Sequence, residues 1–257
     1  MNLAGYLDAA LGVGEVARRT RAALERAGVP VAARTLNAEG VARVPAAEAP
    51  WEPARHPLTL VCANAEGMQG ARAELGDDWF DGRYAIGFWW WEAAVFPSRW
   101  EREFDALDEV WVGSHYVADA LAPVSPVPVV RVPVPVTVAA PDAAARLELP
   151  QGRPLFLVVF DYGAVFERKN PLAAVEAFRR AFGEGDEAAL VVKCVGSERH
   201  PGEHARLLEA AAGDDRIRVI DAVLAPGELS ALLHACDAYV SLHRSEGFGM
   251  VIAEAML

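Results

Sequence analysis

Two glutamates near the end of the sequence flank a glycine-rich turn. Glu246 and Glu254 stand eight positions apart, and the run between them begins Gly247-Phe248-Gly249. The turn follows an apolar run that we expect to be a buried strand, and it opens a helix, which is where ligands bind in parallel α/β sheets. Glycine lets a ligand approach the backbone, and the free amides of a helix start favour an anion.

The spacing of these glutamates argues against one hydrolytic chemistry. Along a full helix the two carboxylates would stand about 12 Å apart, whereas a retaining glycosidase pair needs about 5 Å. The spacing suits an elongated polar ligand held at both ends. The alternative is a strand-to-helix turn with a solvated glutamate on each side.

A second group is the run Phe166-Glu167-Arg168-Lys169-Asn170-Pro171. Pro171 suits the first turn of a helix, so the pattern predicts that Arg168 and Lys169 lie at a helix N-terminus. Positive charge is unfavourable there because of the helix dipole, unless a polyanion arrives between the cations and the amides. An exposed basic pair on a surface turn is the alternative.

Gly12 and Gly14 match the permissive dinucleotide pattern GxGxxA. Only the short apolar run 2–6 precedes them, and no acidic residue closes the following strand at 29–36, so binding of NAD or FAD is disfavoured. We expect instead a glycine-rich loop that another ligand can approach.

His200 and His204 are four positions apart, but Pro201-Gly202 is expected to break the helix between them, and we predict no metal site.

The composition of the sequence limits the classes of partner that the protein is expected to bind and the cellular compartment in which it is expected to lie. The 257 residues allow one large or two small domains, and a formal charge of −12 argues against nucleic acid or an anionic membrane as the main partner. Three separated cysteines, Cys62, Cys194 and Cys236, indicate reduced thiols rather than disulfides or zinc. Neither a signal peptide nor a transmembrane pattern is visible, so we expect a cytoplasmic protein.

Strand and helix patterns alternate twice, with a proline-rich stretch at 123–154 between the two runs. This predicts an α/β fold with two doubly wound parallel-sheet domains, 1–140 and 141–257. The expected strands are 29–36, 58–63, 84–91, 109–113, 155–160, 190–195, 217–220 and 238–242. The expected helices are 14–28, 98–107, 114–121, 171–182, 203–212, 228–235 and one starting near 249.

These features together resemble glycosyltransferase family 4, whose members are retaining enzymes of the GT-B fold. Residues 161–182 and 240–256 are similar to the signatures of its carboxyl domain, and residues 5–24 and 109–121 to its amino domain. The resemblance implies two Rossmann-like domains facing a cleft, the first on the acceptor side and the second binding the sugar donor. The family pattern continues beyond Leu257, so the resemblance also implies that the second domain is incomplete.

The resemblance implies a role for each matching residue. Lys169, with Arg168, would bind the diphosphate of a nucleotide-sugar, and Glu246 would contact sugar hydroxyls near the reacting carbon. The sugar, the distal phosphate and the ribose would be held by the amides of Gly247, Phe248 and Gly249 and by Glu254. Gly12 and Gly14 would belong to a loop that closes over the sugar donor. Two departures stand out: Ala164 occupies the position of a frequent arginine, and Glu92 lies near that of a frequent histidine.

The implied reaction moves a sugar from a UDP- or GDP-sugar to a hydroxyl of a glycan or glycolipid, without metal or cofactor. Bacterial surface glycan synthesis, with possible peripheral membrane contact, is the expected setting. A nucleotide-sugar epimerase of similar fold is one alternative, and it would need no acceptor. A truncated, non-catalytic nucleotide-binding domain is another, and a dehydrogenase is the weakest rival.

Overall fold

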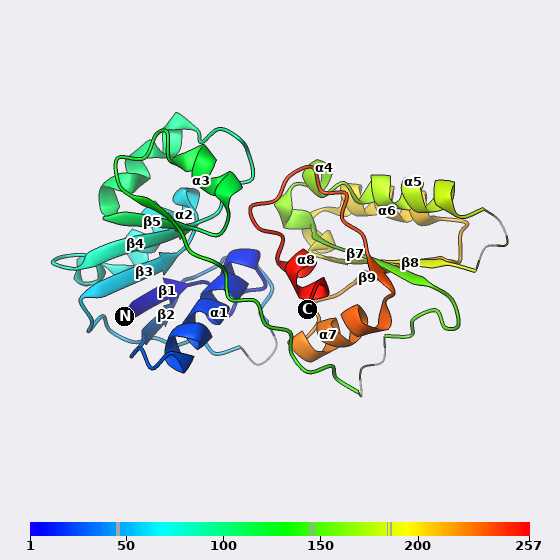
Figure 1. Ribbon diagram of the computed structural model, residues 1–257, viewed down its shortest axis with the longest axis horizontal. Coiled ribbons are helices and arrows are strands. Elements are labelled where there is room, and N and C mark those ends of the chain that lie inside the picture. Colours follow the sequence, from blue (N-terminus) through cyan, green and yellow to red (C-terminus); the bar gives the residue numbers. More distant parts are fainter. Residues whose placement is uncertain (45–46, 144, 146, 184, 186) are drawn as a thin grey trace. The chain divides into compact units, whose positions relative to one another are not determined.

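The protein is built on two parallel sheets, one of six strands and one of four (Figure 1). The computed structural model describes residues 1–44, 47–143, 145, 147–183, 185 and 187–257. Its contacts define two compact units. The first contains Met1–Thr137 with Glu246–Phe248, and the second contains Val138–Ser245 with Gly249–Leu257. The predicted fold class, two doubly wound parallel sheets, is confirmed.

The first sheet has the order β2-β1-β3-β4-β5-β6, and all its strands are parallel. The order reverses between β1 and β3, as in doubly wound folds. Four strands match apolar runs expected from the sequence, and β6, at the edge of the sheet, lies in the proline-rich stretch. The strands are β1 (Asn2–Gly5), β2 (Ala32–Thr35), β3 (Leu58–Cys62), β4 (Tyr84–Trp89), β5 (Glu109–Val112) and β6 (Val129–Arg131).

The helical elements of the first unit differ from expectation in two places. They are α1 (Gly12–Arg26), α2 (Ala65–Leu75), α3 (His115–Leu121) and the 3₁₀ helices η1 (Asp77–Trp79) and η2 (Ser98–Ala106). The helix expected over 98–107 is a 3₁₀ helix, and α2 was not predicted. Both nevertheless contribute to one buried cluster, which includes Met68 of α2 and Phe104 of η2.

The loop before α1 folds back onto the start of that helix. A Cβ on Gly14 would lie 2.5 Å from the Tyr6 carbonyl oxygen and 2.9 Å from that of Ala9. Arg18, one turn further along α1, donates to the carbonyls of Leu7 and Ala9, both at 3.0 Å. The close approach of the chain's own backbone therefore explains why a glycine stands at position 14.

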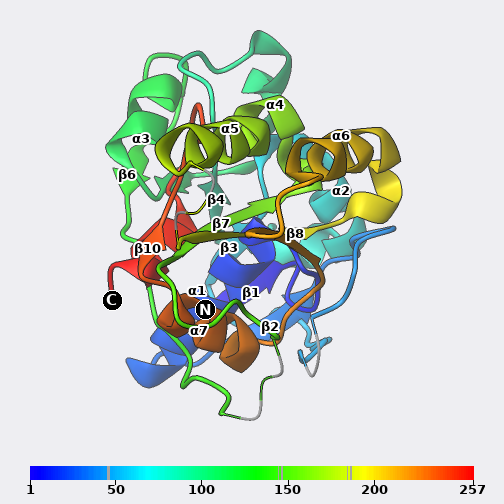
Figure 2. The ribbon, with the colours of Figure 1, turned by 90° about the vertical axis from the view of Figure 1, so that its right-hand side faces the viewer.

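The second sheet has the order β10-β7-β8-β9 and reverses between β7 and β10. Its strands are β7 (Leu155–Asp161), β8 (Ala189–Val195), β9 (Ile217–Asp221) and β10 (Ala238–Tyr239). Its helical elements are η3 (Tyr162–Ala164), α4 (Phe166–Lys169), α5 (Pro171–Ala181), η4 (Ser197–Arg199), α6 (Pro201–Ala211), α7 (Pro226–Ala235) and α8 (Met250–Ala255). Helices α5 and α6 cover one face of this sheet and α7 the other (Figures 1 and 2).

Side chains alternate between the two faces of β7. Val158 and Phe160 pack with Val175 of α5, whereas Leu157 and Val159 pack with Leu232 of α7. The partly buried Val251 of α8 packs against this second cluster. α7 and α8 therefore lie over the same face of the sheet.

One expectation in this unit is wrong. Pro201 does not break a helix but begins α6, because proline lacks only an amide that the first helical turn leaves without an intrahelical partner.

The described part of the chain contains no helix long and apolar enough to cross a membrane.

The close approach at Gly14 gives a matched pair of substitutions. Gly14→Ala should lower the free energy of unfolding by about 1–3 kcal/mol, because the new methyl group meets two carbonyl oxygens. Gly12→Ala meets nothing within 4 Å and should leave it unchanged or raise it by up to about 1 kcal/mol. Urea denaturation of both variants measures the difference, and equal stabilities would contradict this account of the loop.

Candidate functional site

The candidate site lies where the strand order of the second sheet reverses. β10 pairs with β7 in parallel, Ala238 opposite Phe156 and Tyr239 opposite Leu157. The chain therefore leaves both strands at the same edge, the carboxyl edge, which is where ligands bind in such sheets. We call residues 162–170 the β7 loop and residues 240–245 the β10 segment.

Hydrogen bonds join the β7 loop to the β10 segment. The Arg244 amide donates to the Arg168 carbonyl at 2.8 Å, and Arg168 Nη1 donates to the Ser245 carbonyl at 3.0 Å. Arg244 Nε donates to the Glu167 carbonyl, and Asn170 Nδ2 to the Leu242 carbonyl, both at 3.0 Å. Residues as far apart as 77 positions are thus held together, directly before the turn that begins at Glu246.

The two cations of the β7 loop directly precede Asn170, the N-cap of α5, as the sequence predicted, and they also end a short helix that was not predicted. Arg168 and Lys169 form the last turn of the four-residue helix α4, and Asn170 separates them from α5. Asn170 has φ 52°, a left-handed conformation that asparagine adopts more readily than most residues. Asn170 therefore ends α4 and separates the two cations from the first turn of α5.

The start of the β7 loop is fixed by a buried tyrosine. Tyr162 stacks on Phe166 with ring centroids 5.8 Å apart, and its hydroxyl hydrogen-bonds to His204 Nδ1 at 2.9 Å. Burial raises the pKa of the Tyr162 hydroxyl. The family resemblance implies an arginine at position 164. The half-buried Ala164 lies in η3 instead and offers no charge.

α8 presents a buried carboxylate after a left-handed turn. Gly249 has φ 80°, a conformation that most residues adopt only with strain. A Cβ there would also lie 2.9 Å from Ile252 Cδ1. Glu254 is 8% exposed on α8.

The predicted site residues are divided between the two units. Arg168, Lys169, Gly249 and Glu254 belong to the second unit, and the structure joins Arg168 to the residue preceding Glu246. The remaining predicted residues, Gly12, Gly14 and the segment Glu246–Phe248, belong to the first.

Sequence reasoning missed four contributors: the carbonyls of Leu242 and Ser245, the side chain of Asn170 and the guanidinium of Arg244. Asn170 carried a usable signal, since asparagine before proline is typical of a turn.

The three thiols, predicted to be reduced, are free cysteines, and burial raises the pKa of each to about 12.

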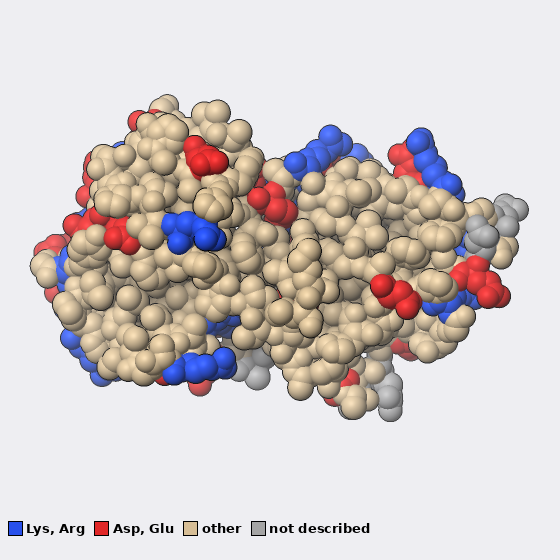
Figure 3. Space-filling model, viewed as in Figure 1, with Lys and Arg blue, Asp and Glu red and all other residues tan. Residues whose placement is uncertain are grey.

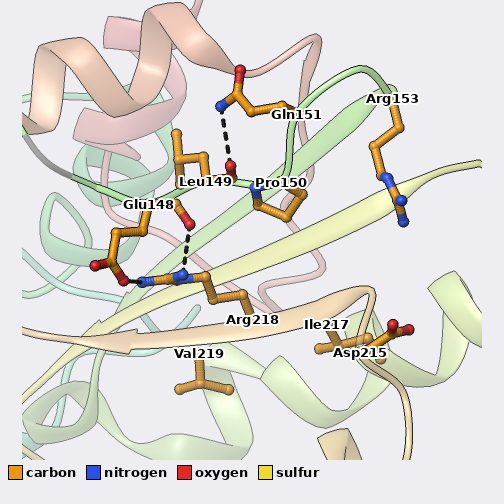
Figure 4. A pocket seen from close by; sticks show the side chains of 9 residues that line it. All are labelled: Glu148, Leu149, Pro150, Gln151, Arg153, Asp215, Ile217, Arg218 and Val219. Atoms are coloured by element: carbon orange, nitrogen blue, oxygen red, sulfur yellow. Dashed lines mark hydrogen bonds and ion pairs between the residues drawn. The ribbon is translucent and has the colours of Figure 1, made fainter.

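A separate hollow of about 520 Å³ lies at the amino ends of β7 and β9 (Figure 4). Arg218 crosses it and donates to the Glu148 carbonyl at 2.6 Å and to the Glu148 carboxylate at 3.3 Å. This is the edge of the sheet opposite to the carboxyl edge, so the hollow is not part of the candidate site.

The second half of the sequence matches a protein-family model. Residues 142–257 match the model described as glycosyl transferases group 1. The match extends over these residues, which make up a little less than half of the chain. They include the β7 loop, the β10 segment and α8, so the family match covers most of the candidate site. No curated protein matches the sequence at a significant level.

Several solved structures share the fold of this chain. A glycosyltransferase from Rickettsia africae is 13% identical over 99% of this chain and 76% of its own, with a TM-score of 0.65. Anabaena Alr3699/HepE, in complex with UDP-glucose, is 12% identical over 100% of this chain and 78% of its own, with a TM-score of 0.59. The pneumococcal O-GlcNAc transferase GtfA, in complex with UDP and GlcNAc, is 15% identical over 77% of this chain, with a TM-score of 0.51. The match covers 40% of GtfA, and these likenesses show the GT-B fold.

Asn170 offers a test of what joins the two segments. Asn170→Gly keeps the left-handed conformation and loses only the bond to Leu242, a loss of about 1 kcal/mol. Asn170→Ala loses the bond and also strains the backbone, so it should be less stable than the glycine variant by about 1–2 kcal/mol. Chemical denaturation measures both. If alanine is tolerated better than glycine, the backbone at this position is not what holds the β7 loop.

Proposed function

We propose that the protein is a retaining glycosyltransferase that moves a sugar from a nucleotide-diphosphate sugar to an acceptor hydroxyl. The observation that carries the proposal is the pairing of the β7 loop with the β10 segment at the carboxyl edge of the second sheet. That pairing puts two half-buried cations next to the segment that leads into the Glu246 turn. The match of residues 142–257 to the family model of group 1 glycosyl transferases supports the same proposal.

Arg168 and Lys169 bind the diphosphate in this proposal. Their charge, with the backbone amides of Gly247, Phe248 and Gly249, stabilises the negative charge that develops on the leaving diphosphate. Fixed charges and dipoles of this kind need little reorganisation during the reaction.

The two glutamates hold other parts of the sugar donor. Glu246 accepts hydrogen bonds from sugar hydroxyls near the anomeric carbon, and Glu254 accepts them from the ribose hydroxyls. Gly12 and Gly14 belong to the first unit, to which we assign the acceptor side.

The reaction breaks the bond between the anomeric carbon and the diphosphate oxygen. The acceptor oxygen forms a new bond to the same carbon on the same face, so the configuration is retained. The electron pair of the broken bond stays with the diphosphate, and the acceptor proton passes to a phosphate oxygen. These reaction steps need neither an added metal nor a redox cofactor.

The proposed sugar donor is a UDP- or GDP-sugar, and UDP-sugars are the first to test. HepE and GtfA were solved with UDP-glucose and with UDP and GlcNAc, respectively. We propose a glycan or glycolipid acceptor, a cytoplasmic location and a role in bacterial surface glycan synthesis, with peripheral contact to a membrane when the acceptor is a lipid.

A nucleotide panel tests the sugar-donor site. One of UDP, GDP, ADP or their sugars, at about a hundred times its dissociation constant, should stabilise the protein by about 2.7 kcal/mol in a thermal-shift measurement. Glu254→Gln should remove most of that gain, because a neutral amide is a weaker acceptor than a carboxylate for the ribose hydroxyls. Glu209→Gln, on the exposed surface of α6, is the control. Absence of stabilisation by every nucleotide would contradict the proposal.

Turnover tests the role of Glu246. Glu246→Gln should lower kcat for sugar transfer about 10²-fold while nucleotide binding persists, because the sugar is held less accurately near the reacting carbon. Glu167→Gln changes the same functional group on the exposed side of the β7 loop and should leave kcat unchanged. Release of a free epimer without any acceptor would favour the epimerase alternative. Nucleotide binding with no turnover would favour a non-catalytic nucleotide-binding domain.

A further inference from the structure

Lys193 is a cation buried in an apolar layer of the second unit. It lies on β8 between Val159 of β7 and Ile220 of β9, and it is 7% exposed. Val159, Ile220 and Val191, two residues before Lys193, all belong to the layer under α7. Val251 of α8 packs against the same layer.

No residue in the described part of the chain forms an ion pair or hydrogen bond with the Lys193 ammonium group. The two carboxylates that act on this ammonium electrostatically also have hydrogen-bond donors of their own. Asp161, which ends β7, accepts from the Gly163 amide at 2.8 Å, and Asp221, which ends β9, accepts from the Ser197 hydroxyl. Burial lowers the pKa of the Lys193 ammonium, and the acidic groups of Cys194, Asp161 and Asp221 offset this only in part. A buried cation in this state destabilises the fold.

The ammonium group can reach the carboxyl edge of the sheet. β8 ends at Val195, two residues beyond Lys193, which is about 7 Å of strand. The four-carbon stem of an extended lysine spans a similar length. This edge, on the face covered by α7 and α8, is also where Gly249 leads into α8.

Lysine is rare in this chain, and both lysines lie near this edge. The sequence contains 24 lysines and arginines together, of which only Lys169 and Lys193 are lysines. Lys169 ends α4 in the β7 loop, and Lys193 approaches the same edge from β8. A compact ammonium on a flexible stem binds phosphate as a point charge, without the fixed fork of arginine.

We propose that Lys193 binds the diphosphate of the nucleotide-sugar as a third cation, in addition to Arg168 and Lys169. The inference rests on the proposed function and adds a residue to its sugar-donor site. An arriving diphosphate supplies the partner that the described residues do not provide. Lys193 is thereby retained for binding, at a cost in stability while the site is empty.

Titration calorimetry of Lys193→Met tests the binding of the diphosphate by Lys193, and thermal unfolding of the same variant tests its cost in stability. The variant should bind UDP or GDP, whichever the wild type binds, about tenfold to a hundredfold more weakly, with inorganic pyrophosphate affected in the same way. Affinity for uridine or guanosine should not change. Tm of the empty protein should rise by about 2 °C or more, because a buried unpaired cation has been removed. Arg218→Met, on the same face of the sheet at its amino edge, should leave nucleotide affinity unchanged.

The two lysines also allow a direct measurement on the wild type. Protein labelled with ¹³C at lysine Cε should give two lysine signals, assigned by the loss of one in Lys169→Arg. Pyrophosphate should shift the Lys193 signal and raise the pKa that it reports. This measurement keeps the test valid should Lys193→Met fail to fold.

The outcomes separate this inference from the proposed function. If the wild type binds no nucleotide, the proposed function fails and this inference fails with it. If the wild type binds and Lys193→Met binds equally well, or the Lys193 signal ignores pyrophosphate, the inference alone is overturned. If affinity for the nucleoside falls as much as affinity for the diphosphate, Lys193 contacts the base or ribose and the phosphate assignment is overturned.

Discussion

The candidate site depends on the reversal of strand order between β7 and β10. β10 is only two residues long, so backbone pairing alone holds its end weakly against β7. The bonds from Arg168, Arg244 and Asn170 extend the connection beyond the sheet, where no strand ladder exists. They are side-chain bonds to carbonyls and one bond between backbones. Arg168 and Arg244 therefore hold the β7 loop in place, and they also bring positive charge to the carboxyl edge of the sheet.

The pattern of apolar residues predicted most of the fold because parallel strands are buried on both faces and read as continuous apolar runs. β3, β7 and β8 are of this kind. α2 was not predicted because its sequence contains two glycines and several charges, and its buried side consists only of Ala65, Met68, Ala71 and Leu75. Residues 98–106 have the apolar spacing of an α-helix but form a 3₁₀ helix, since spacings of three and four residues serve both.

Residue types predicted which groups gather at the candidate site better than they predicted its geometry. The cations were found in front of α5, but the short helix α4 that they end was not predicted, because the left-handed backbone of Asn170 separates two helical turns that the sequence presents as one. Contacts such as Arg168 to Ser245 join residues 77 positions apart, so no local pattern encodes them. Lys193 was hidden inside an apolar run that reads as an ordinary strand. The scarcity of lysine elsewhere in the chain was the signal that could have revealed it.

On the proposed function an acidic protein binds a polyanion, so the distance over which its surface charges repel that ligand matters. The chain carries a formal charge of −12, yet the charged side chains on the face shown in Figure 3 are scattered in small groups. At physiological ionic strength, interactions between exposed charges weaken beyond about 8 Å, so most of the acidic surface is screened from a ligand at the carboxyl edge. Cations that are half-buried or buried are screened less, so their attraction survives where the repulsion of the distant carboxylates does not. The burial that preserves this attraction also removes the hydration of each cation. Arg168 recovers part of that loss through the Ser245 carbonyl, whereas we propose that Lys193 recovers it only when the diphosphate binds.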